Sequence, residues 1–138
     1  MNRIVLLFVL LGISFLTKAQ QQVENKDTIY ISEKMPQFPG GDDAFYTYLD
    51  KNVHLPDGFD AAAYLVENGN QFVPISVAFT INVDGSIINA HVIEKVNEML
   101  DNKAVEIIKN MPKWEPGFKN GKSIKVQYAI PVRFNLKG

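Results

Sequence analysis

The chain has 138 residues, enough for one domain with a modest core, and a net charge of −1 from 14 basic and 15 acidic residues. This mildly acidic balance gives no basis for expecting nucleic acid or an anionic membrane surface as a partner. Cysteine is absent, which excludes disulfides, thiolate metal sites, cysteine nucleophiles and lipid attachment to cysteine.

The start of the chain is typical of a secretory signal peptide. Arg3 supplies positive charge, residues 4–16 form an apolar run, and small residues lead to Ala19 before Gln20. As a helix this run spans about 20 Å, against about 30 Å of bilayer hydrocarbon. We therefore expect cleavage between Ala19 and Gln20 and release into the periplasm. A retained inner-membrane anchor facing the periplasm is the alternative.

No internal repeat or low-complexity tract follows the leader. The sequence predicts a polar, flexible lead-in over residues 20–32 and a single domain over residues 33–138. Cleavage at Gln20 would remove two basic residues and leave 12 basic against 15 acidic, a net charge of −3. The mature protein would therefore also be mildly acidic.

A cluster of proline and glycine at residues 36–41 precedes the first predicted helix. Phe45, Tyr48 and Leu49 recur at helical spacing behind it. Residues 57–70 are ambiguous: residues 61–66 could form a helical turn, which Asn68-Gly69-Asn70 would end.

Strict alternation of apolar residues from Val73 to Val83 predicts a strand with one buried and one wetter face. Asp84-Gly85 follows at once, a strong hairpin signal because both residue types tolerate positive φ. The return strand over residues 86–95 loses its alternation. A β-bulge near Ile88 or Asn89 would explain the slip.

A second helix is predicted over residues 98–110, with Asn97 as its N-cap and one apolar face. After a loop, Asn120-Gly121 turns the chain into a last alternating strand from Ser123 to Asn135. The predicted order is helix, strand, strand, helix, strand. This pattern indicates a two-layer α+β domain, a three-stranded antiparallel sheet covered on one face by two helices.

Pro131 lies inside the last predicted strand. Proline cannot donate to a strand ladder, so this strand belongs at the edge of the sheet. Lys125 and Arg133 on its wet face would keep an edge soluble, and protection against aggregation explains them as well as binding does. The candidate partner-binding residues on this edge are Ser123, Lys125, Gln127, Ala129, Pro131, Arg133 and Asn135.

The sequence offers little support for catalysis. His54 follows a helix and His91 lies on the wet side of a strand, so no zinc constellation is recognisable. Asp42 and Asp43 are adjacent and fit the first turn of a helix better than a metal site. Trp114, the only tryptophan, fits the core best, with a secondary partner contact as the alternative. We expect no enzyme, no cofactor and no metal.

Four stretches together resemble the TonB C-terminal domain family, in the form common in Bacteroidota. They are residues 35–41 (MPQFPGG), 79–87 (FTINVDGSI), 111–117 (MPKWEPG) and 128–134 (YAIPVRF), within a resemblance over residues 33–136. The resemblance implies a TolA/TonB C-terminal-like fold. Two features depart from the family: no proline-rich spacer is recognisable, and the segment 57–72 is longer and lacks the usual glycine before the first strand.

The resemblance also implies a partner. In the family, the edge strand accepts the TonB box, an extended segment of an outer-membrane transporter, and this corresponds to strand addition. A retained leader would add the inner-membrane motor ExbB–ExbD as a partner. The alternative is a scaffold or sequestering module for another cell-envelope protein, without energy transduction. A homodimer is left open, and the sequence names neither the transporter nor its substrate.

Overall fold

The computed structural model describes residues 33–138. The predicted signal cleavage between Ala19 and Gln20 and the lead-in over residues 20–32 lie outside these described residues.

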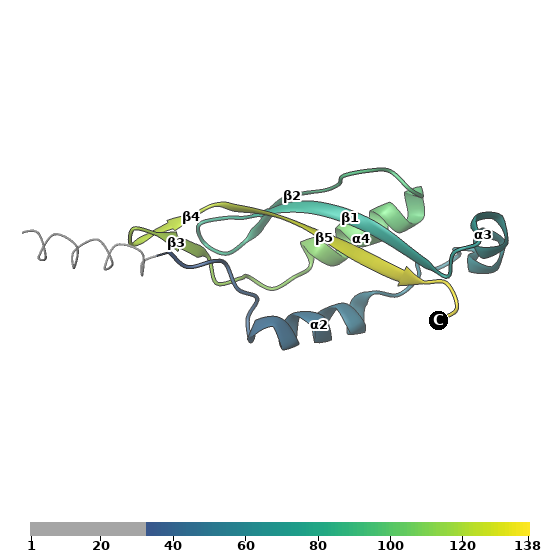
Figure 1. Cartoon of the computed structure of the whole chain (residues 1–138), viewed down its shortest axis with the longest axis horizontal. Helices are drawn as coiled ribbons and strands as arrows, with labels where there is room; N and C mark the ends of the chain where they lie inside the picture. The colour runs from purple at the N-terminus through teal and green to yellow at the C-terminus, as the bar shows by residue number, and fades with distance from the viewer. Residues whose placement is uncertain (1–32) are drawn as a thin grey trace, which may run out of the picture.

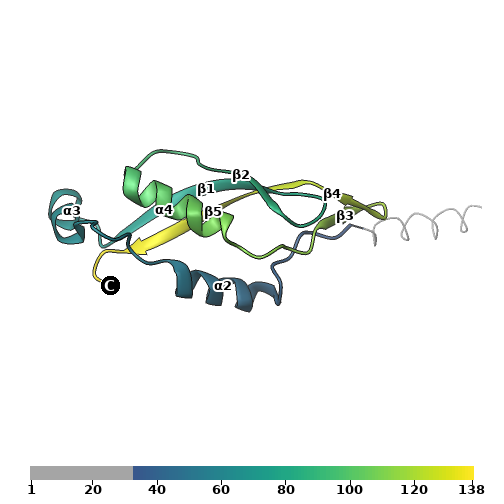
Figure 2. The same ribbon diagram turned by 180° about the vertical axis from the view of Figure 1, so that it is seen from behind.

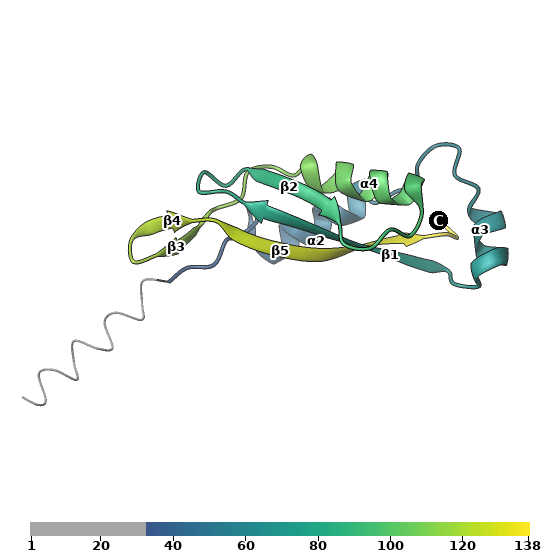
Figure 3. The same cartoon turned by 90° about the horizontal axis from the view of Figure 1, so that it is seen from above.

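Two layers make up the domain, as the sequence predicts (Figure 1). The elements are α2 (Gly41–Asn52), α3 (Ala61–Asn68), β1 (Phe72–Ile81), β2 (Ile87–Val92), α4 (Glu98–Lys109), β3 (Gly117–Lys119), β4 (Lys122–Ile124) and β5 (Val126–Asn135). A three-stranded antiparallel sheet has the order β2-β1-β5, and β3 and β4 form a separate hairpin. Helices α2 and α4 lie behind the sheet in Figure 3, which looks onto its open face. The α+β prediction is confirmed.

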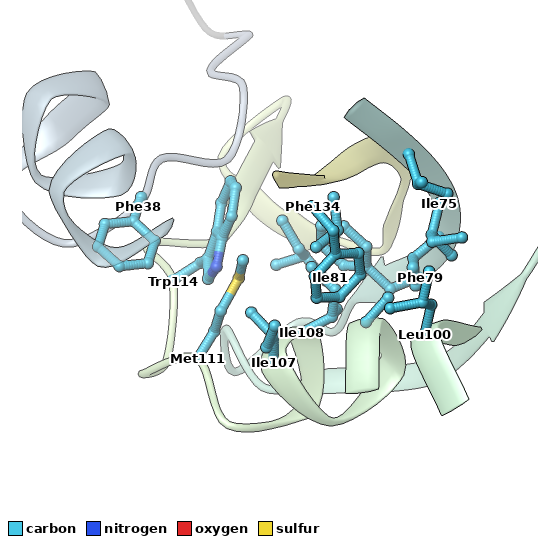
Figure 4. Packing of buried hydrophobic residues seen from close by; sticks show 14 of the residues in the cluster. Phe38, Ile75, Phe79, Ile81, Leu100, Ile107, Ile108, Met111, Trp114 and Phe134 are labelled. Carbon is cyan, nitrogen blue, oxygen red and sulfur yellow. The ribbon is translucent and has the colours of Figure 1, made fainter. Parts of the chain in front are cut away.

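The core forms between the sheet and α4. Alternate residues of β1 are fully or almost fully buried, and the buried face of α4 packs in the same cluster. Figure 4 shows these side chains meeting between the layers. They include Ile75, Val77, Phe79 and Ile81 from β1 and Leu100, Ala104, Ile107 and Ile108 from α4. Asn97 caps α4 as predicted, because its side-chain oxygen accepts from the N–H groups of Met99 and Leu100 at 3.0 and 3.2 Å.

Helix α2 is held less deeply, since none of its residues is buried. Its predicted apolar face, with Phe45, Tyr48 and Leu49, packs partly buried against the core. The Tyr48 hydroxyl donates to the carbonyl of Ile107 at 2.7 Å and so joins α2 to α4. Burial raises the pKa of the Tyr48 phenol above 10.0, so this donor stays protonated at neutral pH.

The ambiguous segment contains a true helix, α3, at one end of the molecule (Figure 2). The Asp60 side chain accepts from the Ala63 N–H at 2.9 Å and caps its start. Gly69, with φ 76°, ends it in the left-handed conformation that glycine adopts without strain. These capping residues were the signal in the sequence, because the apolar pattern alone was too short to decide.

The Asp84-Gly85 signal marks the turn between β1 and β2, but the loop is longer than two residues. The Gly85 N–H donates to the Asn82 carbonyl at 2.9 Å, and only Gly85, not Asp84, has positive φ. A Cβ on Gly85 would lie 1.9 Å from the carbonyl oxygen of Trp114, whose N–H donates to the Gly85 carbonyl at 2.8 Å. Glycine is therefore required here by both φ and space.

The predicted bulge in β2 is present. Ala78 pairs with His91 and Thr80 with Ile88, so β2 uses one residue more than β1 over this interval. Asn89 lies within it at φ 55°. Asparagine is one of the few non-glycine residues that tolerate this conformation.

The predicted last strand, Ser123 to Asn135, is wrong at its start. Ser123 belongs to β4 and pairs with Phe118 of β3, while β5 begins at Val126. Asn120 and Gly121 have φ 53° and 75°, the signature of a two-residue type I′ turn, which pairs the residues on both sides of it. The prediction from the sequence placed this turn only at the start of the last strand and did not include β3.

Candidate binding edge

The order β2-β1-β5 places β5 at one margin of the sheet, as Pro131 predicted. The strand has ten residues and pairs with β1 without interruption, from Phe72 opposite Asn135 to Ile81 opposite Val126. Among the residues that the structure describes, no strand lies on its outer side (Figure 3).

Neighbouring hydrogen bonds establish which backbone groups of β5 face outward. The N–H of Ile93 donates to the carbonyl of Ser76 at 2.9 Å, so the backbone groups of Ser76 face β2. Ser76 lies opposite Pro131, and the N and C=O of Pro131 therefore point away from β1. At the end of the same ladder, the Leu136 N–H donates inward to the Gln71 carbonyl at 2.8 Å, which gives the same alternation.

The outward positions are the odd-numbered residues of β5. Their carbonyls, and every N–H except the one that proline lacks, are directed to the open edge: Gln127, Ala129, Pro131, Arg133 and Asn135. Five of the seven predicted edge residues are thus brought together. Ser123 pairs in β4, and Lys125 lies between the two strands.

Two of these side chains already have contacts within the domain. The Arg133 guanidinium carbon lies 4.0 Å from the ring centroid of Phe72, a cation–π contact on the open face. The Asn135 side-chain oxygen accepts from the Gln71 side chain and from the Lys137 N–H, both at 3.1 Å. Neither contact could be predicted from the sequence, because each joins residues that only the register brings together.

Trp114 is 8% exposed and lies between Phe38 and the core side chains in Figure 4. It is the common member of an aromatic cluster. Its ring centroid lies 5.7 Å from Phe38, 5.9 Å from Phe45 and 5.7 Å from Tyr128. Its Nε1 is buried without a hydrogen-bond partner among the described residues. The prediction of a core position is confirmed, while a contact with a partner stays a prediction.

The open face of the sheet carries a hollow of about 350 Å³ beside the β5 edge. Its lining includes Ala78, Thr80, Asn89, His91, Gln127 and Ala129, from all three strands. We call it the open-face hollow. The small residues on the wet face of β1 were visible in the sequence, but the hollow also depends on the register of the two neighbouring strands.

Over residues 33–138, no group of three or more histidine, aspartate or glutamate side chains could hold a metal ion. Within the same range, no helix is long and apolar enough to cross a membrane. His54 and His91 lie on different elements, and each contacts a nearby backbone carbonyl, of Lys51 and Asn89 respectively.

Comparison with known families gives one match, to the family described as Gram-negative bacterial TonB protein C-terminal, over residues 67–136. The match covers slightly more than half of the chain. The protein belongs to the TonB C-terminal domain family. Neither the curated proteins nor the solved structures gave a match.

The matched range of this TonB C-terminal domain takes in the whole sheet, α4 and the β5 edge. The stretch 35–41 and helix α2 lie outside it, so the match is narrower than the resemblance noted in the sequence. The family is not enzymatic, and membership implies a TonB-like role in energy transduction and transporter binding at the cell envelope.

Proposed function

We propose that this protein is a periplasmic module that binds the TonB box of an outer-membrane transporter by strand addition along β5. The observation that carries the proposal is the row of outward backbone groups on an uninterrupted ten-residue margin of the sheet. In strand addition, main-chain hydrogen bonds supply affinity and alternate side chains supply selectivity.

The ladder along this margin would be uneven. Gln127 and Ala129 each offer an N–H and a carbonyl, whereas Pro131 offers only its carbonyl. A partner strand would therefore be held most firmly beside the first half of β5 and would lose one donor at its centre. The gap also limits unwanted pairing with other strands, since an edge proline is a common protection against aggregation.

Charge adds a preference. Lys125 precedes the strand, and Arg133 is exposed on its open-face side over Phe72. Acidic side chains on the matching positions of a partner strand would meet these cations, which would steer association and fix register. Screening by salt should weaken this part of the interaction while sparing the backbone ladder.

Location follows from the leader. We propose that the signal peptide is cleaved between Ala19 and Gln20 and that the mature protein acts in the periplasm, where it would contribute the transporter-binding part of the TonB-like role; ExbB–ExbD would be a partner only if the leader is retained. Sequencing of the N-terminus of the native protein should give Gln20 or a residue within two positions of it. Recovery of Met1 or Asn2 in the inner-membrane fraction would contradict cleavage and would restore the motor as a partner.

Capture from outer-membrane extract tests the binding. The full mature chain, fixed to beads, is expected to retain transporters that mass spectrometry identifies, and Ala129→Pro should retain markedly less. Circular dichroism must show that the variant is folded. Equal retention by both forms would place binding away from β5. Retention of other envelope proteins alone would instead support the scaffold or sequestering role.

A further inference from the structure

We propose that the open-face hollow is a side-chain subsite, which receives a tyrosine from the strand that adds to β5. The inference rests on the proposed strand addition and goes beyond it by naming one side chain that the partner presents. It begins from the register of the sheet and not from any bound molecule.

Three residues form a row across the sheet through the hollow. His91 of β2 lies opposite Ala78 of β1, and Ala78 lies opposite Ala129 of β5. Cross-strand neighbours have their side chains on the same face of the sheet. Because Ala78 and Ala129 have small side chains, they leave open space above the sheet between the β5 edge and His91. Gln127 and Thr80, directly opposite each other, form the next row and one wall of the hollow.

The hollow is continuous with the binding edge. Gln127 and Ala129 line it and also direct their backbone groups outward to the open edge. A partner residue added beside Ala129 would project its side chain onto the same face. Strands lie about 4.8 Å apart, so the added strand would run about 10 Å from β1. A long side chain can cross Ala129 and bring its tip over Ala78, whereas a short one cannot.

The lining indicates which long side chain fits. It contains no aspartate, glutamate, lysine or arginine, so a charged tip would lose water without gaining an opposite charge. The alanine row gives a flat apolar floor for a ring. The hydroxyl of Thr80, the amides of Asn89 and Gln127 and the imidazole of His91 surround it with hydrogen-bonding groups. The phenol of tyrosine fits both parts of the hollow: its ring would pack on the alanine row, and its hydroxyl would reach the surrounding hydrogen-bonding groups.

The experiment uses three nine-residue peptides of alternating threonine and valine, capped at both ends. The central threonine is replaced by tyrosine, phenylalanine or alanine, and affinity for the mature protein is measured by fluorescence anisotropy. We expect the tyrosine peptide to bind about tenfold tighter than the alanine peptide, because burial of an aromatic ring adds affinity. The phenylalanine peptide should lie between them.

Two variants locate the effect. Ala129→Leu fills the row without removing a backbone group and should abolish the preference for tyrosine over alanine. Thr80→Val removes one hydroxyl and should bring the tyrosine and phenylalanine peptides closer together. Ser76→Leu is the matched control, because it adds the same bulk to the open face one row away, outside the hollow lining, and should leave the preference intact.

The outcomes separate the two proposals. Suppose all three peptides bind equally and Ala129→Pro weakens them all: strand addition then stands and the tyrosine subsite is overturned. If no peptide binds, or if Ala129→Pro binds all three like wild type, strand addition itself fails and the subsite fails with it. A tyrosine preference that survives Ala129→Leu would also overturn the subsite.

Discussion

The two margins of the sheet, β5 and β2, differ in length, regularity and cover. Strand β5 pairs with β1 over ten residues, whereas β2 has six and is interrupted by a bulge at Asn89. Helix α4 packs against β2 and β1, behind the β2 side of the sheet (Figure 3). A bulged, short margin is a poor template for another strand, while a long regular one is a good template. The contrast supports the proposal that β5, and not β2, is the margin to which a partner strand adds.

Protection of the two margins also differs in kind. Strand β2 is protected by its geometry, since the bulge breaks the alternation of backbone groups. Strand β5 is protected by two substitutable features, the missing N–H of Pro131 and the charge of Arg133. Geometric protection is permanent, whereas β5 can still accept a strand whose sequence tolerates these features.

The largest effect should come from the core that both margins share. Phe79→Ala and Ile107→Ala, at sites 2% and 4% exposed, should each cost about 2–5 kcal/mol of unfolding free energy through lost burial and a cavity. Urea denaturation measures it. Phe72→Ala, at a site 41% exposed, is the control and should cost much less. Unfolding midpoints close to wild type for Phe79→Ala would mean that the packing of sheet on helix is assigned wrongly.

Proline substitution compares the margins directly. Gln127→Pro removes an outward N–H from β5 and should weaken peptide binding about tenfold, the effect of about one hydrogen bond. Val92→Pro is the counterpart on β2, where Ile93 donates inward and the neighbouring amide therefore faces out. It should leave affinity unchanged if the protein stays folded by circular dichroism. A greater loss for Val92→Pro would move the binding margin to β2.

The bulge itself can be tested at Asn89. Asn89→Ala should destabilise the fold by about 1 kcal/mol, because alanine tolerates φ 55° less well than asparagine. Asn89→Gly is the matched control, since glycine adopts this φ without strain. Thermal unfolding of the wild type and the two variants gives the order of their stabilities. Equal melting of the alanine and glycine variants would show that the backbone at Asn89 relaxes.

The sequence predicted those features that depend on local pattern. Alternation located β1, the slip in alternation located the bulge, and Pro131 identified the edge. Features that depend on partners distant in sequence were not predicted: the contact of Arg133 with Phe72, the row of Ala78 and Ala129, and the hollow around it. Each of these follows from register, which periodicity alone leaves undetermined.

One error and one undecided segment had local causes. The Asn120-Gly121 turn is a complete type I′ hairpin, so the strand β3 before it could have been inferred from the same two residues. Asp60 and Gly69 cap α3, but the segment between them has too little amphipathic pattern to stand out. Both lie outside the central edge, and only the missed hairpin moved Ser123 and Lys125 away from β5.

The smallest expected effect concerns Asp84, in the turn that leads from β1 into β2. The hydroxyl and the backbone N–H of Ser86 donate to its carboxylate at 2.6 and 3.0 Å, and together with the more distant Lys113 they hold the pKa of Asp84 below its ordinary value of 3.8. A carboxyl whose pKa is lowered by folding stabilises the fold above its unfolded pKa. That contribution to stability is lost as the pH falls through the pKa that the carboxyl has in the folded protein.

Ser86→Ala removes the strongest of these donors, so the pKa of Asp84 should rise towards 3.8 and the acid dependence of stability should flatten. Titration of the Asp84 carboxylate by NMR measures the first effect, and urea unfolding between pH 2 and about pH 5 measures the second. Lys113→Met should shift the pKa in the same direction but less, because the charges are 3.8 Å apart and exposed. Affinity of the β5 edge for a peptide should be the same in both variants, because the turn joins β1 to β2 and contains no residue of β5. An unchanged titration in Ser86→Ala would mean that the hydroxyl does not hold the carboxylate in solution.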